Sequence, residues 1–142
     1  MPVCFLDTNI LLRFLTRDDE QKAQQALNLL LRIERGEEKV ITSSLVIFET
    51  VYTLQSFYKV PRQHIKEQVL SIISLRSLHL PDKNLFHRAF DLYVSKNISF
   101  ADAYNAAYME SEEVSNIYTW DRDFDRIDGI ARLEPPLEQD EG

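Results

Sequence analysis

Short strand-like runs alternate with longer segments of helical periodicity along this chain, and that alternation limits the folds open to it. The strand-like runs are the apolar Val3–Leu6 and the segments "KVITSS", "SLHL", "NIYTW" and "ARLE". Between them, apolar residues recur every three or four positions, as in Ile10, Leu11, Phe14 and Leu15. Such a pattern is typical of a mostly parallel sheet with helices on both faces. The sequence therefore predicts a three-layer α/β/α fold with a central sheet of four or five short strands.

Local signals place several helix boundaries. Gly36 is a plausible stop for the helix over residues 23–33, and the serines of "KVITSS" can cap the helix that follows. Pro61 suits the first turn of a further helix. Residues 1–133 are expected to form one domain, since 142 residues are enough for a single core.

Composition indicates an ordinary globular protein, with 44% apolar and 27% charged residues. No apolar run approaches the ~20 residues of a membrane span, and no basic segment precedes an apolar stretch as in a signal peptide. The lone Cys4 cannot form an internal disulfide and is expected to be a small core residue. These features favour a cytoplasmic protein without a membrane partner.

The net charge of −7 argues at first against a nucleic-acid partner. However, residues 134–142 hold four acidic residues and no basic one, so the rest of the chain carries −7 + 4 = −3. That segment is expected to be a flexible acidic tail. The charge therefore leaves nucleic-acid binding open.

Four carboxylates occupy matching places in the predicted fold. Asp7 and Asp121 follow apolar strands, and Glu49 and Asp102 lie near the starts of helices that follow strands or loops. In a parallel sheet, ligands bind beyond the carboxyl ends of the strands, and all four residues fall at that edge. Glu49 has the apolar neighbours Ile47, Phe48 and Val51, so we expect it to be buried.

Each carboxylate also has a structural explanation. Asp7 could cap a helix, Ser99-Phe-Ala-Asp102 fits a capping box, and Asp121 could start a turn. Their joint occurrence favours an acidic site. Clustered carboxylates repel one another unless a cation compensates them, and oxygen ligands select Mg²⁺ or Mn²⁺. Such ions suit hydrolysis of a phosphodiester.

The ordered set "FLDTNILLRFLTRDD", "SSLVIFETVYTL", "SFADAYNAAY" and "YTWDRDF" resembles the PIN-domain nucleases, and most closely the VapC toxin ribonucleases of toxin–antitoxin pairs. The resemblance implies a Mg²⁺- or Mn²⁺-dependent endoribonuclease. Its expected partners are RNA, a cognate antitoxin protein and a second copy of the chain in a homodimer.

The resemblance also implies roles for individual residues. Asp7 and Asp102 would hold the metal directly, Asp121 would contribute through water or a second ion, and Glu49 would orient or deprotonate the attacking water. Asn9 and Thr119 would orient the site by hydrogen bonding. Asp123 matches a more variable acidic position, so its role is open. For Trp120 and Tyr104, which adjoin the site, core packing is favoured over stacking on a base.

Three other classes of protein share some of these features. A response-regulator receiver needs an acidic pair after the first strand and a Lys after a late strand, whereas this chain has Asp7 alone and Trp120-Asp121. A phosphatase with an aspartyl nucleophile needs Asp-x-Asp, but position 9 is Asn. An inert PIN-like interaction module remains an alternative, although the four carboxylates argue against it.

Overall fold

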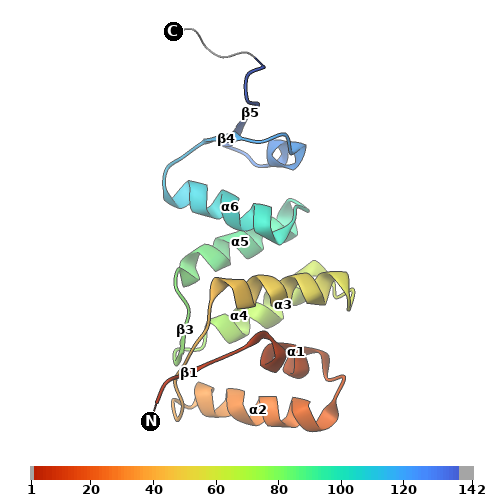
Figure 1. Ribbon diagram of the computed structural model, residues 1–142, viewed down its shortest axis with the longest axis vertical. Helices are drawn as coiled ribbons and strands as arrows, with labels where there is room; N and C mark the ends of the chain where they lie inside the picture. Colours follow the sequence, from red (N-terminus) through yellow and green to blue (C-terminus); the bar gives the residue numbers. More distant parts are fainter. Residues whose placement is uncertain (1, 138–142) are drawn as a thin grey trace. The chain divides into compact units, whose positions relative to one another are not determined.

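The structure, a computed structural model, describes residues 2–137, and the chain divides into two compact units, residues 1–87 and 88–142 (Figure 1). The first unit holds three strands and four helices, and α5 (Lys83–Ser95) begins in it and continues into the second. Each unit is described by itself. Of the acidic tail expected over residues 134–142, residues 138–142 lie outside the described part of the chain.

A three-stranded parallel sheet organises the first unit. Its strands lie in the order β1-β2-β3 and are β1 (Cys4–Phe5), β2 (Val40–Ile41) and β3 (Leu78–His79). The helices are α1 (Thr8–Thr16), α2 (Glu20–Glu34), α3 (Ser44–Ser56) and α4 (Arg62–Ile73). Helix α1 packs against α2 and α3, and α3 packs against α4. Parallel strands need crossover helices between them, and α1 to α4 supply these.

Capping residues mark the helix boundaries in this unit. The side chain of Ser43 accepts a hydrogen bond from the amide of Val46 at the start of α3, and that of Asp19 accepts one from Lys22 at the start of α2. Gly36, with a φ of +77°, follows the end of α2 as predicted. Pro61 is the N-cap of α4, one residue before the first turn where it was expected.

The second unit contains a two-stranded parallel sheet. Strand β4 (Asn116–Tyr118) pairs with β5 (Ala131–Leu133), and the 3₁₀ helix η1 (Arg122–Arg126) lies between them in sequence. Helix α6 (Phe100–Ser111) precedes β4. Phe90 and Tyr93 of α5 are fully buried and form ring contacts with Phe100, at centroid distances of 4.6 and 5.5 Å. This aromatic cluster joins α5 to the first turn of α6.

The α/β fold and all five predicted strands are confirmed, but the strands form one sheet of three and one of two. The strands are also very short, at two or three residues each. No helix among residues 2–137 is long and apolar enough to cross a bilayer.

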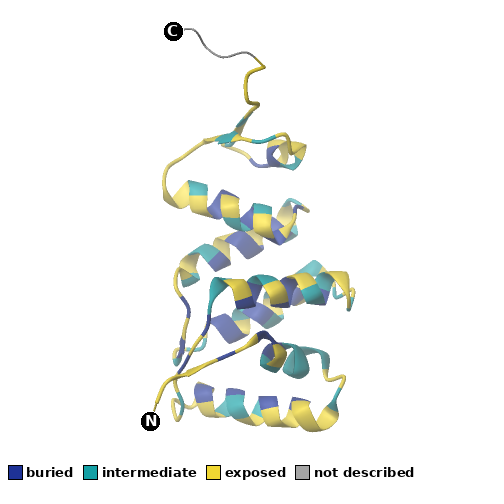
Figure 2. Cartoon of the chain, viewed as in Figure 1, coloured by how far each residue is buried: buried dark blue, intermediate teal, exposed yellow. Residues whose placement is uncertain are grey.

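Three expectations about burial are wrong (Figure 2). Cys4 is exposed, since β1 is an edge strand of its sheet. Glu49 is exposed because the buried residues of α3, among them Ile47 and Val51, lie on a different face of the helix. Trp120 is 71% exposed in the loop after β4 and so is not a core residue.

Candidate metal and catalytic site

Three carboxylates of the second unit lie close together. Oxygen atoms of Asp102, Asp121 and Asp123 all lie within 4.8 Å of one another. Asp102 is in the first turn of α6, Asp121 is in the segment after β4, and Asp123 is in η1. The sequence predicted Asp102 and Asp121 as site residues, and the structure brings these two together.

Short-range hydrogen bonds fix the backbone that carries these carboxylates. Ser99 caps α6, its hydroxyl accepting a bond from the Asp102 amide at 3.1 Å. The hydroxyl of Thr119 accepts a bond of 3.0 Å from the amide of Asp121, and Oδ1 of Asp121 accepts one of 2.9 Å from the amide of Asp123. Asp121 thus uses one oxygen as the cap of η1.

Electrostatic repulsion distinguishes the cluster from a set of caps. Partial burial raises the pKa of Asp102 above its usual value, and the negative charges of Asp121 and Asp123 raise it further. A hydrogen bond from the Ser99 side chain to the Asp102 carboxylate lowers this pKa and offsets part of the rise. Arg126 lies 3.5 Å from Asp123 in an exposed ion pair and offsets part of the charge. The ionised cluster is therefore unfavourable in itself and would be stabilised by a cation.

Asp7 and Glu49 lie in the first unit. Asp7 is the N-cap residue of α1, yet its exposed side chain forms no capping hydrogen bond. Capping therefore does not account for a carboxylate at this position. Asp7 follows β1, separated from it by the buried Leu6, so it stands at the carboxyl end of that strand as predicted.

A buried hydroxyl holds the carboxylate of Glu49. Thr8, which is only 7% exposed, donates from Oγ1 to Oε2 of Glu49 at 2.9 Å. This bond joins the first turn of α1 to α3, so Asp7 and Glu49 are carried by elements that are directly linked. Asn9, the next residue of α1, is exposed and forms no side-chain hydrogen bond within residues 2–137.

Two residues at these sites were not predicted as members. The sequence leaves the role of Asp123 open, although "DRDFD" offers three acidic residues in a turn, a spacing that can bring Asp121 and Asp123 together. The motifs assign no role to Thr8 in "LDTN". Its only signal was a hydroxyl beside Asp7 on a helix that is otherwise apolar on its inner face.

The donor set fits a hard divalent cation. Asp102, Asp121 and Asp123 offer carboxylate oxygens only, and the described residues place no His or Cys with them. Mg²⁺ and Mn²⁺ are bound by one or a few carboxylates together with waters, which suits three partly exposed aspartates.

Comparison with known proteins agrees with these features. A family model described as "PIN domain" matches residues 4–130. A protein named "VapC ribonuclease" from Aquifex aeolicus (strain VF5) is 26% identical over 130 residues, which cover 92% of this chain and 95% of the relative. The match of the family model spans most of the chain, including every carboxylate discussed above, and the chain therefore belongs to the PIN domain family.

Proposed function

We propose that this protein is a metal-dependent endoribonuclease that hydrolyses phosphodiester bonds in RNA. The observation that carries the proposal is the cluster of Asp102, Asp121 and Asp123, whose oxygens lie within 4.8 Å in a chain of the PIN domain family. The similarity to a VapC ribonuclease over 92% of the chain supports RNA as the substrate.

Asp7, Asp102 and Asp121 are proposed to hold the ion, which is Mg²⁺ or Mn²⁺, and Asp123 to contribute a further carboxylate. When bound, the ion would polarise the phosphodiester and favour the hydroxide form of a bound water. Glu49 orients the attacking water and accepts its proton, since its Oε2 is held by Thr8 and its other oxygen has no hydrogen-bond partner among residues 2–137.

The wider biological proposal follows from the resemblance to VapC proteins. We propose that the protein is the toxin of a toxin–antitoxin pair, that a cognate antitoxin inhibits it, and that it acts in the cytoplasm as a homodimer. A neighbouring reading frame that encodes a small DNA-binding protein would support this assignment, and inhibition by its product would test it.

Cleavage of RNA tests the activity itself. Purified protein is incubated with a pool of structured RNAs in Mg²⁺, in Mn²⁺ or in EDTA. We expect cleavage with either ion, none with EDTA, and loss of cleavage in Asp7→Asn. Asn caps helices about as well as Asp, so loss of activity cannot be assigned to the helix end. Asp128→Asn, which removes an exposed carboxylate outside the cluster, is the matched control.

Undiminished cleavage by folded Asp7→Asn would remove Asp7 from the mechanism. Absence of cleavage under all conditions, with the protein shown to be folded, would favour the inert PIN-like module instead.

A further inference from the structure

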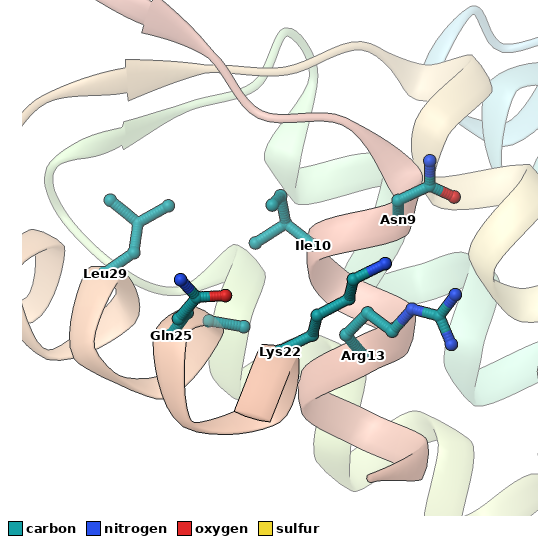
Figure 3. A pocket seen from close by; sticks show the side chains of 7 residues that line it. Asn9, Ile10, Arg13, Lys22, Gln25 and Leu29 are labelled. Atoms are coloured by element: carbon teal, nitrogen blue, oxygen red, sulfur yellow. The ribbon is translucent and has the colours of Figure 1, made fainter. Parts of the chain in front are cut away.

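A pocket lies between α1 and α2 in the first unit (Figure 3). It has a volume of about 460 Å³. Helix α1 contributes Asn9, Ile10 and Arg13 to its lining, and α2 contributes Lys22, Gln25 and Leu29. Figure 3 shows Lys22 extending from α2 toward α1, on the same side as Arg13 and Asn9. The pocket therefore combines an aliphatic wall with cationic and amide side chains.

The charge of this pocket is opposite to that of the protein. Its lining contains two cations and no Asp or Glu, although the chain carries a net charge of −7. The ammonium group of Lys22 has no ion pair or hydrogen bond among residues 2–137. Arg13 donates from Nη1 to Asp18 at 2.9 Å, which orients its guanidinium group and neutralises part of its charge. An anion in this pocket would interact with the unpaired ammonium group of Lys22 and with the oriented guanidinium group of Arg13.

The pocket begins next to a proposed catalytic residue. Asp7 is the N-cap of α1, Asn9 is in its first turn, and Arg13 lies one turn beyond Asn9. A helix rises 1.5 Å per residue, so the Arg13 backbone lies about 9 Å along the axis from that of Asp7. If one phosphate of a nucleic-acid strand lies at Asp7, a neighbouring phosphate of the same strand can therefore lie at the pocket, further along α1.

We propose that this pocket is a phosphate-binding subsite for the single-stranded RNA that flanks the cleaved bond. Lys22 and Arg13 bind a phosphate, and the amides of Asn9 and Gln25 donate to phosphate or ribose oxygens. Ile10 and Leu29 form an apolar surface for the ribose or base. The proposal rests on the proposed ribonuclease function, but it concerns binding of RNA and can be tested without cleavage.

The salt dependence of RNA binding tests this subsite. The affinity of the full chain for a fluorescent single-stranded RNA is measured by anisotropy at several KCl concentrations, in EDTA and in the Asp7→Asn background, and a gel confirms that the RNA stays intact. Each phosphate contact contributes about −0.7 to the slope of log affinity against log salt on single strands. Lys22→Ala should therefore make that negative slope shallower by about 0.7. The change should be similar for RNAs of different sequence.

Lys39→Ala is the matched control, because Lys39 is an exposed lysine of the same unit outside this pocket. It changes the net charge equally and should leave the slope unchanged. Arg13→Ala is a second variant, expected to lower the slope as well, with circular dichroism to confirm folding after loss of the bond to Asp18.

An unchanged slope in Lys22→Ala, or an equal reduction in Lys39→Ala, would overturn the subsite. Loss of binding to a protein partner in Lys22→Ala, with RNA binding intact, would also overturn it by assigning the pocket to that partner. If the protein binds RNA with the expected slopes but cleaves none, the result would support the subsite and contradict the proposed ribonuclease activity.

Discussion

Thr8 shows how one buried hydroxyl can hold an exposed carboxylate, here that of Glu49, for which we propose a catalytic role. Its side chain is 7% exposed and its only hydrogen bond among the described side chains goes to Glu49, which is exposed. A long glutamate side chain on a helix surface has many rotamers, and ordering it has an entropic cost. The bond from Thr8 offsets part of that cost before substrate binds.

We predict that Thr8→Val reduces metal-dependent cleavage about tenfold, because Glu49, which is proposed to orient the attacking water, loses the bond that positions its carboxylate. Valine has nearly the shape of threonine, so packing at this buried position is kept. Thr8→Ser, which retains the hydroxyl, should keep most of the activity. The rate constant of single-turnover cleavage is the measurement, and equal rates for Thr8→Val and wild type would show that the bond to Glu49 does not matter for the reaction.

Asp18 is a carboxylate whose pKa is lowered by its hydrogen-bond partners. It accepts hydrogen bonds from Tyr58 at 2.8 Å and from Arg13 at 2.9 Å, and these bonds lower its pKa. The hydrogen bond between Asp18 and Tyr58 links the turn between α1 and α2 to the segment after α3. A carboxylate whose folded-state pKa is lowered stabilises the fold above its unfolded pKa, and the contribution disappears as pH falls through the folded value.

Tyr58→Phe should therefore be less stable than wild type at neutral pH, because it loses the bond that lowers the pKa of Asp18 most. The difference in free energy of unfolding should shrink as the pH falls below about 4 and Asp18 becomes protonated. Urea unfolding of both proteins at pH 7 and at pH 3 measures this. A difference that stays constant with pH would mean that the phenol stabilises the fold by packing alone.

Among the elements, the positions of helices and strands were predictable from local sequence signals. The pairing of the strands into sheets was not. Apolar periodicity located α2 and α3, and Ser43 and Ser99 marked two helix starts that the structure confirms. Strands as short as Cys4–Phe5 and Leu78–His79 were still visible as apolar runs. Periodicity carries no information on which strands pair, so the division into sheets of three and two required the structure.

Burial was the least predictable property of the candidate site. The apolar neighbours of Glu49 suggested that it is buried, but Ile47 and Val51 face inward while Glu49 lies on another side of α3. A helix turns about 100° per residue, so neighbours in sequence do not share an environment. The joining of Asp123 to Asp102 and Asp121 depends on a 3₁₀ turn, which sequence patterns specify only weakly.

For the whole molecule, the proposed metal binding would be coupled to stability through the carboxylates. The raised pKa of Asp102 means that the folded protein holds that proton more tightly than the unfolded chain does. This contribution to stability is complete below the unfolded pKa and is lost as pH rises through the folded value. At neutral pH without metal, the folded chain therefore bears repulsion that a bound cation or the loss of one charge would remove.

We predict that metal-free Asp102→Asn melts at or above the wild-type temperature at pH 7, because asparagine keeps the shape and removes the charge. Added Mn²⁺ should raise the melting temperature of wild type, since a ligand that binds only the folded state stabilises it by mass action. The same Mn²⁺ should do much less for Asp102→Asn. If Asp7 is also a ligand, Asp7→Asn should lose the response in the same way, and Asp128→Asn should keep it.

A purely structural role for Asp102 predicts the reverse order. Loss of a helix-end interaction would lower the stability of Asp102→Asn by about 1 kcal/mol or less, and Mn²⁺ would affect both proteins equally. Thermal melts in EDTA and in Mn²⁺ separate these outcomes without any assay of cleavage. The negative charges of Asp121 and Asp123 oppose ionisation of Asp102, and a helix cap alone does not require three clustered carboxylates, so a cation bound by the cluster explains their arrangement better than the end of α6 does.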